Sequence, residues 1–207
     1  MKQYILSLVI LFFLASCQEH KSEKQEQTIE DHIKTELTKN INNETIFLGL
    51  RFGMGGEDVH NYFRELVSQG KLQLLPHKYL SDKGKIYIYK FEFEDEDLLL
   101  QNVLGTFKTY YIQDKLYKLR ISVESEKESN LQLLKSKLKE AYVSKYGQNY
   151  IIRESIYNNS EGYVWIIGNT MIEISEGLSN NILILYTDLI ALKENKERPV
   201  EKLMREI

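Results

Sequence analysis

The fold class follows from residues 107–123, which read FKTYYIQDKLYKLRISV. Apolar and polar residues alternate in both halves of this stretch, and this period of two is typical of strands with one buried face. The polar residues 113–115 separate the two halves, so the stretch predicts a β-hairpin with a three-residue turn. Because hairpins need antiparallel strands, the stretch favours an antiparallel sheet.

The apolar pattern also selects the register of this hairpin. A three-residue turn pairs Phe107 with Ile121 and Tyr111 with Tyr117, so that apolar side chains meet on one face. A slip by one residue would set apolar side chains opposite charged ones and turn every side chain to the wrong face. The first register is therefore the predicted one.

The other face of the predicted hairpin carries three cations and a tyrosine. The register places Lys108 opposite Arg120 and Tyr110 opposite Lys118. Two cations that face each other across a strand pair are unfavourable unless an anion lies nearby. The expected anion is Glu92 on a neighbouring strand, and the alternative is an acidic partner molecule. Lys108, Tyr110, Lys118 and Arg120 are therefore the candidate binding residues.

Helices and further strands are predicted on both sides of the hairpin. Apolar residues at helical spacing predict one long helix over 57–70, after a glycine-rich turn at 53–56, and a second over 130–146. Alternating or apolar runs predict strands over 46–52, 72–79, 86–93, 98–112, 116–123, 150–157, 163–167, 170–175 and 181–187. Helices and strands do not alternate one for one, so the predicted class is α+β: an antiparallel sheet with two main helices packed on one side. A helix followed by several strands occurs twice, which raises the hypothesis of a duplicated unit.

Four segments are predicted along the chain. Residues 1–16 are a signal peptide, and residues 17–44 are a lipidated tether with a short helix over 28–40. Residues 45–190 form the globular domain, and residues 191–207 form a charged tail or helix. The folded part is long enough for one domain.

The first residues have the pattern of a bacterial lipoprotein signal. Lys2 precedes an apolar run that is too short to span a bilayer, and Leu14-Ala15-Ser16-Cys17 resembles a lipobox. In that family the cysteine becomes the first residue and carries a diacylglycerol thioether, and a further acyl chain supplies the second anchor. Gln18 follows the cysteine, which favours the outer membrane over the inner one. The resemblance implies a lipid bilayer as the partner of an acylated Cys17.

Short patches later in the chain contain glycine or tyrosine. They are FLG at 47–49, KYG at 145–147 and Tyr186-Thr187-Asp188, and they resemble patches in small Bacteroidota lipoproteins of unknown function. The helix-then-sheet order is also similar to the repeated unit of beta-lactamase inhibitory protein and of outer-membrane assembly lipoproteins. This analogy of fold implies binding rather than catalysis.

Composition and motifs argue against several kinds of chemistry. The net charge of −3 gives no basic field for nucleic acid. Cys17 is the one cysteine, so the predicted acylation leaves no thiol nucleophile. His32 and Glu36 have helical spacing for a metal, but no second pair supports them, and the acidic run at 92–97 lacks the spacing of a calcium loop. We expect no cofactor and no metal site.

Two functions remain open at this point. The first is a non-catalytic, membrane-anchored binding module at the cell envelope, whose expected partner is a protein or another envelope component. The second is an envelope-associated hydrolase whose paired carboxylates are hidden among the 30 acidic residues. No sequence motif singles out such a pair, so the first is the predicted function.

Overall fold

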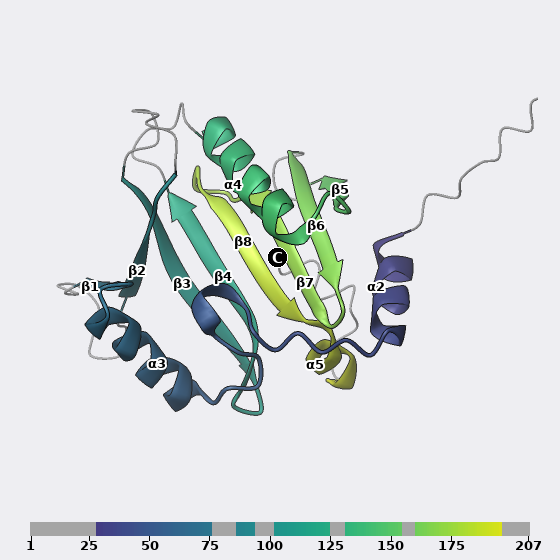
Figure 1. Cartoon of the computed structure of the whole chain (residues 1–207), viewed down its shortest axis with the longest axis horizontal. Helices are drawn as coiled ribbons and strands as arrows, with labels where there is room; N and C mark the ends of the chain where they lie inside the picture. Colours follow the sequence, from purple (N-terminus) through teal and green to yellow (C-terminus); the bar gives the residue numbers. More distant parts are fainter. Residues whose placement is uncertain (1–27, 76–85, 94–101, 125–130, 155–159, 196–207) are drawn as a thin grey trace, which may run out of the picture.

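A single antiparallel sheet dominates the structure. The computed structural model describes residues 28–75, 86–93, 102–124, 131–154 and 160–195 (Figure 1). Within these ranges eight strands form one sheet, and each neighbouring pair is antiparallel. The predicted α+β class with an antiparallel sheet is therefore confirmed. The predicted signal segment, Cys17, residues 18–27 and the end of the charged tail (196–207) lie outside the described residues.

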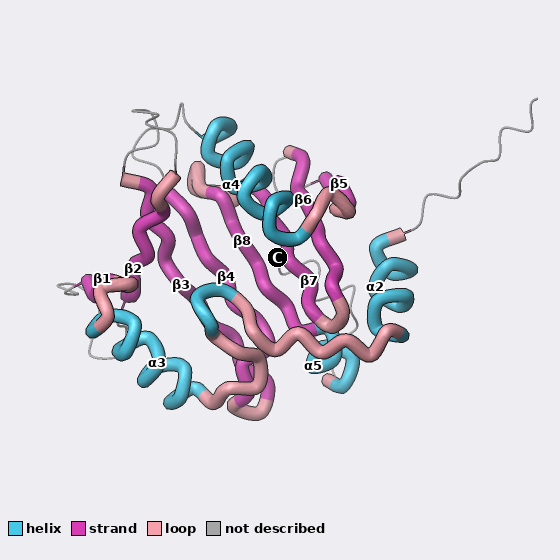
Figure 2. Tube along the Cα trace, in the orientation of Figure 1, coloured by secondary structure: helices cyan, strands magenta, loops and turns pink. Residues whose placement is uncertain are grey.

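The helices and strands follow one another in two similar series. They are α2 (Ile29–Thr38), η1 (Phe47–Gly49), α3 (Gly56–Ser68), β1 (Gln73–Leu75), β2 (Ile86–Phe91), β3 (Val103–Ile112), β4 (Lys115–Glu124), α4 (Leu131–Tyr146), β5 (Ile151–Glu154), β6 (Glu161–Ile167), β7 (Thr170–Glu176), β8 (Ile182–Asp188) and α5 (Leu189–Glu194). Across the sheet the order is β1-β2-β3-β4-β8-β7-β6-β5. Two four-stranded meanders therefore meet along β4 and β8, and each meander comes directly after a long helix in the sequence (Figure 2).

A tight two-residue turn joins β3 to β4. Gln113 and Asp114 both have positive φ, 50° and 59°, and Ile112 pairs with Lys115. Two central residues with positive φ define a type I′ turn, whose twist matches that of two antiparallel strands. The predicted three-residue turn over 113–115 is therefore wrong.

A register shift beside this turn compensates for the shorter connection. Tyr111 pairs with Leu116 rather than with the predicted Tyr117. Leu116 and Leu119 are three residues apart, so a regular strand would turn them to opposite faces. Both are nevertheless buried, at 1% and 0% exposure. A bulge that adds one residue to β4 explains how both leucines reach the core.

The main core is one cluster of buried side chains from the sheet and from the two long helices. Residues of α3 and α4 belong to the same cluster of buried side chains as residues of β4 and β8. The cluster includes Val59, Phe63 and Leu66 of α3, Leu134, Leu138 and Tyr142 of α4, Leu119, Ile121 and Val123 of β4, and Ile182, Ile184 and Tyr186 of β8. Burial of each such apolar side chain contributes roughly 1.5–3 kcal/mol. The core thus spans both meanders.

The predicted strand over 46–52 is wrong. The chain instead forms the 3-10 turn η1, with Leu48 and Gly49 in positive φ at 54° and 84°. An isolated bridge between Thr45 and Arg51 closes this loop. The ring of Phe47 packs against the core, with its centroid 5.2 Å from that of Tyr89. The apolar density that predicts a strand therefore belongs to a loop that caps the core.

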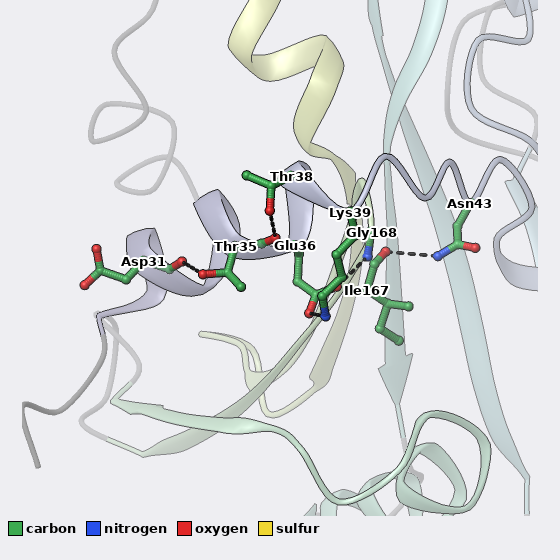
Figure 3. Close-up of polar contacts among 8 residues, drawn as sticks. All are labelled: Asp31, Thr35, Glu36, Thr38, Lys39, Asn43, Ile167 and Gly168. Atoms are coloured by element: carbon green, nitrogen blue, oxygen red, sulfur yellow. Dashed lines mark hydrogen bonds and ion pairs between the residues drawn. The ribbon is translucent and has the colours of Figure 1, made fainter.

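Helix α2 is tied to the turn between β6 and β7. Thr28 and Asp31 form the predicted capping pair at its start. Near its end the Glu36 carboxylate accepts a hydrogen bond of 3.1 Å from the Gly168 backbone N–H. Farther along, the Asn43 side chain donates one of 3.0 Å to the backbone of the same hairpin (Figure 3). The segment that leads into the domain is thus fixed to its sheet at two points.

Candidate functional site

The hairpin of β3 and β4 brings the four sequence-predicted binding residues together. Lys108 pairs with Arg120, and Tyr110 pairs with Lys118, as the alternation predicts. Their neighbour Leu119 belongs to the core, so the four side chains lie on the opposite face, which we call the outer face. These two pairings are confirmed, while binding by these residues stays a prediction.

Tyr110 lies close to two of the cations. The Nζ atoms of Lys108 and Lys118 are 5.1 and 5.4 Å from the centroid of its ring. Such cation–π contacts contribute about 0.5–1 kcal/mol at exposed sites, so the ring offsets part of the repulsion between the cations. Lys108 is exposed, whereas Lys118 is buried at 7% exposure. Lys108 is therefore the more accessible cation for a partner.

Glu92 does not neutralise these cations, contrary to the sequence interpretation. Thr106 pairs with Ile88, so Lys108 lies level with Ile86 at the start of β2. Glu92 follows the other end of β2, six residues from Ile86. At about 3.4 Å per residue, this separation is roughly 20 Å along the strand. The two residues are at opposite ends of the β2–β3 pair.

The carboxylate that the structure does place on the outer face belongs to Glu173. It lies in the same row as Arg120, two strands away across β8, and it is buried at 5% exposure. Arg153 approaches it at 3.6 Å, and the charge of Lys118 also acts on it. Burial raises the pKa of the Glu173 carboxyl because desolvation outweighs the attraction of Arg153 and Lys118. No sequence pattern predicts that Glu173 lies here, because β7 joins β4 only through β8.

Three polar atoms on the outer face are buried without a hydrogen-bond partner. They are Arg120 Nε, Thr187 Oγ1 and Glu173 Oε2, on the consecutive strands β4, β8 and β7. A buried polar group without a partner costs about 1–3 kcal/mol. Asn181 Oδ1 is the fourth such atom in the described ranges, and it lies just before β8. The outer face therefore holds both a donor and an acceptor that a ligand can satisfy.

Arg120 and Lys108 are the cations of the outer face whose charges are least compensated by nearby carboxylates. Within the described ranges, neither has a carboxylate at ion-pair distance, whereas Arg153 is paired with Glu173. Arg120 is half-buried, and its Nε–H group has no acceptor. A guanidinium binds a carboxylate or phosphate through two parallel hydrogen bonds. The chemistry of this pair thus suits an anionic group.

The other sequence candidates have structural roles. The Glu36 carboxylate forms an ion pair with Lys39 as well as its contact with Gly168, so it has two partners within the protein itself. Among the described residues, no group of three histidine, cysteine or carboxylate side chains is arranged to hold a metal ion. His20, His77 and the acidic residues 94–97 lie outside the described residues.

The glycine-rich turn before α3 is occupied by a group of the protein itself. The Gly56 N–H donates a hydrogen bond of 3.2 Å to Asp114 Oδ1, from the turn between β3 and β4. A carboxylate is favourable at the positive end of a helix dipole. Asp114 therefore takes the position that a phosphate would need, in line with the sequence interpretation of this segment as a turn.

Comparisons with known proteins leave the chain without an assigned relative. No protein-family model matches it, and neither a curated protein nor a solved structure matches it. Among the helices of the described ranges, none is long and apolar enough to cross a membrane.

Proposed function

We propose that this protein is a membrane-anchored lipoprotein whose folded part is a non-catalytic binding module at the cell envelope. The lipobox pattern Leu14-Ala15-Ser16-Cys17 supports the anchor and an outer-membrane location. The observation that carries the binding role is the pairing of Lys108 with Arg120 across β3 and β4. No carboxylate of the described residues lies at ion-pair distance from either cation. An acidic segment of a protein partner supplies the missing charge.

The arrangement of this surface supports recognition of a protein by charge. Lys108 is exposed beside the half-buried Tyr110 and Arg120. Tyrosine and arginine are enriched where interfaces form, because each combines apolar area with hydrogen-bonding groups. The strand pair holds the three side chains in one fixed register, so little conformational freedom is lost on binding.

We also infer that α3 and α4 pack on the same face of the sheet and that the two helix-plus-meander units are duplicated. Phe63 of α3 and Leu138 of α4 contribute to one core cluster with the core face of β4 and β8. The order of strands is symmetric about the β4–β8 junction. A symmetric order of this kind is what a duplicated unit gives when two copies join along their last strands.

The alternative function, an envelope hydrolase, needs two facing carboxylates. Two cavities lined by described residues each carry one acidic side chain, Glu30 in one and Glu44 in the other. No observation on the described residues favours the hydrolase over the binding module.

Reversing the charge of the proposed surface tests the binding role. The double variant Lys108→Glu and Arg120→Glu is expected to lose a dedicated envelope partner, with recovery reduced at least about tenfold, because like charges then face the acidic segment. The measurement is crosslinking on intact cells followed by affinity capture and quantitative mass spectrometry. Lys71→Glu is the matched control, since Lys71 is exposed after α3 and lies outside the surface. Equal recovery of every protein from wild type, double variant and control contradicts the proposal.

The anchor has its own test in Cys17→Ala. This variant is expected to fold but to remain in the soluble fraction, because it lacks the thiol that accepts the diacylglycerol. Metabolic labelling with radioactive palmitate and membrane fractionation measure the effect, and Ser16→Ala serves as the control that keeps the cysteine. Label on the Cys17→Ala protein would rule out this residue as the acylation site.

A further inference from the structure

A cavity of about 550 Å³ lies on the core side of the sheet, away from the outer face. It is bounded by residues 42–46, by the last turn of α4, and by β6, β7 and β8. Figure 1 shows the segment between α2 and η1 crossing the sheet near the end of β8. Ile172 and Tyr186 are the most buried of its lining residues, each 1% exposed. Cavities of this size are typical of sites for small molecules.

A chain of three tyrosine hydroxyls leads from the core to this cavity. The hydroxyl of Tyr142 shares a hydrogen bond with that of Tyr186, and Tyr186 shares another with Tyr146. Tyr142 is buried at 7% exposure, whereas Tyr146 is half-buried and lines the cavity. Burial raises the pKa of both Tyr142 and Tyr186, so these two hydroxyls keep their hydrogens at neutral pH.

The number of hydrogens fixes the direction of this chain. Each hydroxyl has one hydrogen, and two hydrogen bonds inside the chain use two of the three. If Tyr142 kept the third, a buried O–H group would lack an acceptor, at a cost of about 1–3 kcal/mol. The favoured order therefore runs from Tyr142 through Tyr186 to Tyr146, which donates its hydrogen into the cavity. Bonds in such a chain polarise and strengthen one another.

The charges at the cavity rim favour an anion near Tyr146. The Lys145 ammonium lies 5.0 Å from the centroid of the Tyr146 ring, and the described residues provide it with no carboxylate at ion-pair distance. Glu44 lies on the wall formed by residues 42–46, where it accepts a hydrogen bond of 3.3 Å from Asn42. The cation and the phenolic donor are thus adjacent in sequence, at the end of α4.

We propose that this cavity binds a small organic carboxylate with an apolar body. The carboxylate accepts the hydrogen bond of Tyr146 and faces the ammonium group of Lys145. The apolar body packs on Ile46, Ile167 and Ile172, which line the cavity. Because the site lies on the core side, this proposal is independent of the binding role of Lys108 and Arg120, and either one can fail alone.

Three probes with the same apolar chain test the preference for an anion. Hexanoate, 1-hexanol and hexylamine are titrated into the full-length protein, with binding followed by NMR of labelled isoleucine methyl groups. Saturable shifts of Ile46 and Ile172 are expected, with hexanoate binding at least about tenfold tighter than 1-hexanol, since charge-assisted hydrogen bonds are the stronger ones. Equal or tighter binding of hexylamine or hexanol overturns the proposal, and so does the absence of any saturable shift.

Two variants separate the roles of the two groups. Tyr146→Phe removes only the hydroxyl and is expected to lower the preference for hexanoate over hexanol about tenfold, while Lys145→Gln lowers it about threefold. Tyr150→Phe is the matched control, because the Tyr150 ring packs between Tyr163 and Trp165 and does not line the cavity. The ratio of the two affinities is the readout, since general damage to the fold weakens both probes alike. An unchanged ratio in Tyr146→Phe overturns the hydroxyl-chain argument.

Discussion

Glu176→Leu is expected to lower the free energy of unfolding by about 3–5 kcal/mol, because it removes one partner of a buried ion pair. In the native protein the Lys135 ammonium donates to Glu176 Oε1 at 2.8 Å, and the two side chains are 7% and 9% exposed. Gln132 donates to the same oxygen at 2.9 Å. Leucine removes the carboxylate, so the buried Lys135 ammonium group is left with no ion-pair partner among the described residues. This bond also joins α4 to the end of β7, so its loss weakens the contact between helix and sheet.

Urea unfolding followed by circular dichroism measures this effect. Glu140→Leu is the control, because Glu140 lies on the same helix with its side chain 65% exposed, and exposed pairs contribute about 0–1 kcal/mol. The double variant Lys135→Met and Glu176→Leu is expected to recover most of the loss, since neither charge then remains buried. A loss below about 1 kcal/mol in the single variant contradicts the argument from burial.

Ile184→Ala is expected to cost about 2–5 kcal/mol, because it opens a cavity where the two meanders meet. Ile184 pairs with Ile121 of β4 and with Ile174 of β7, and all three are 0% exposed. The substitution therefore affects the junction of the sheet as well as one strand. If the two meanders form one cooperative unit, the transition shifts as a whole and stays single.

Two probes of unfolding distinguish these outcomes. Far-UV circular dichroism reports on the whole sheet, and the fluorescence of Trp165, the one tryptophan, reports on β6 in the second meander. The two curves are expected to coincide for wild type and variant. Ile152→Ala is the control, since Ile152 is 57% exposed in β5 and its replacement should change stability by less than about 0.5 kcal/mol. Separate midpoints for the two probes would show that the meanders unfold independently.

The sequence was most informative where its period matched the structure over a whole element. Alternation in 107–123 predicted the hairpin and the pairing of Lys108 with Arg120, because a one-residue slip would bury charge. Helical spacing likewise predicted α3 and α4, which the structure places at Gly56–Ser68 and Leu131–Tyr146. These features depend on local patterns, which a single sequence contains.

The errors arose where neighbours distant in sequence decide the conformation. The segment 46–52 is apolar enough for a strand, but Leu48 and Gly49 adopt positive φ so that Phe47 can pack on the core. The bulge beside Tyr111 accompanies a type I′ turn, which the residues Gln113 and Asp114 do not predict. Apolar composition alone cannot separate a strand from a loop that caps a core.

Other polar groups of the candidate sites could not be predicted from the sequence. Glu173 reaches the neighbourhood of Lys118 only because β8 lies between β4 and β7. The hydroxyl chain needs Tyr142 and Tyr146, one helical turn apart, to meet Tyr186 from a strand that follows much later. Single-sequence patterns carry no information on such meetings, since both depend on the order of strands in the sheet.

The attachment of α2 to the β6–β7 turn determines how an anchored protein would stand above a bilayer. On the proposal that Cys17 carries the lipid, the ten residues 18–27 can span at most about 35 Å before α2 begins. Glu36 and Asn43 hold the chain against one end of the sheet. A force transmitted through residues 18–27 therefore acts on that end of the sheet. The same end is then kept nearest the lipid headgroups, and the opposite end, with the α4 start and the β7–β8 turn, faces outward to approaching molecules.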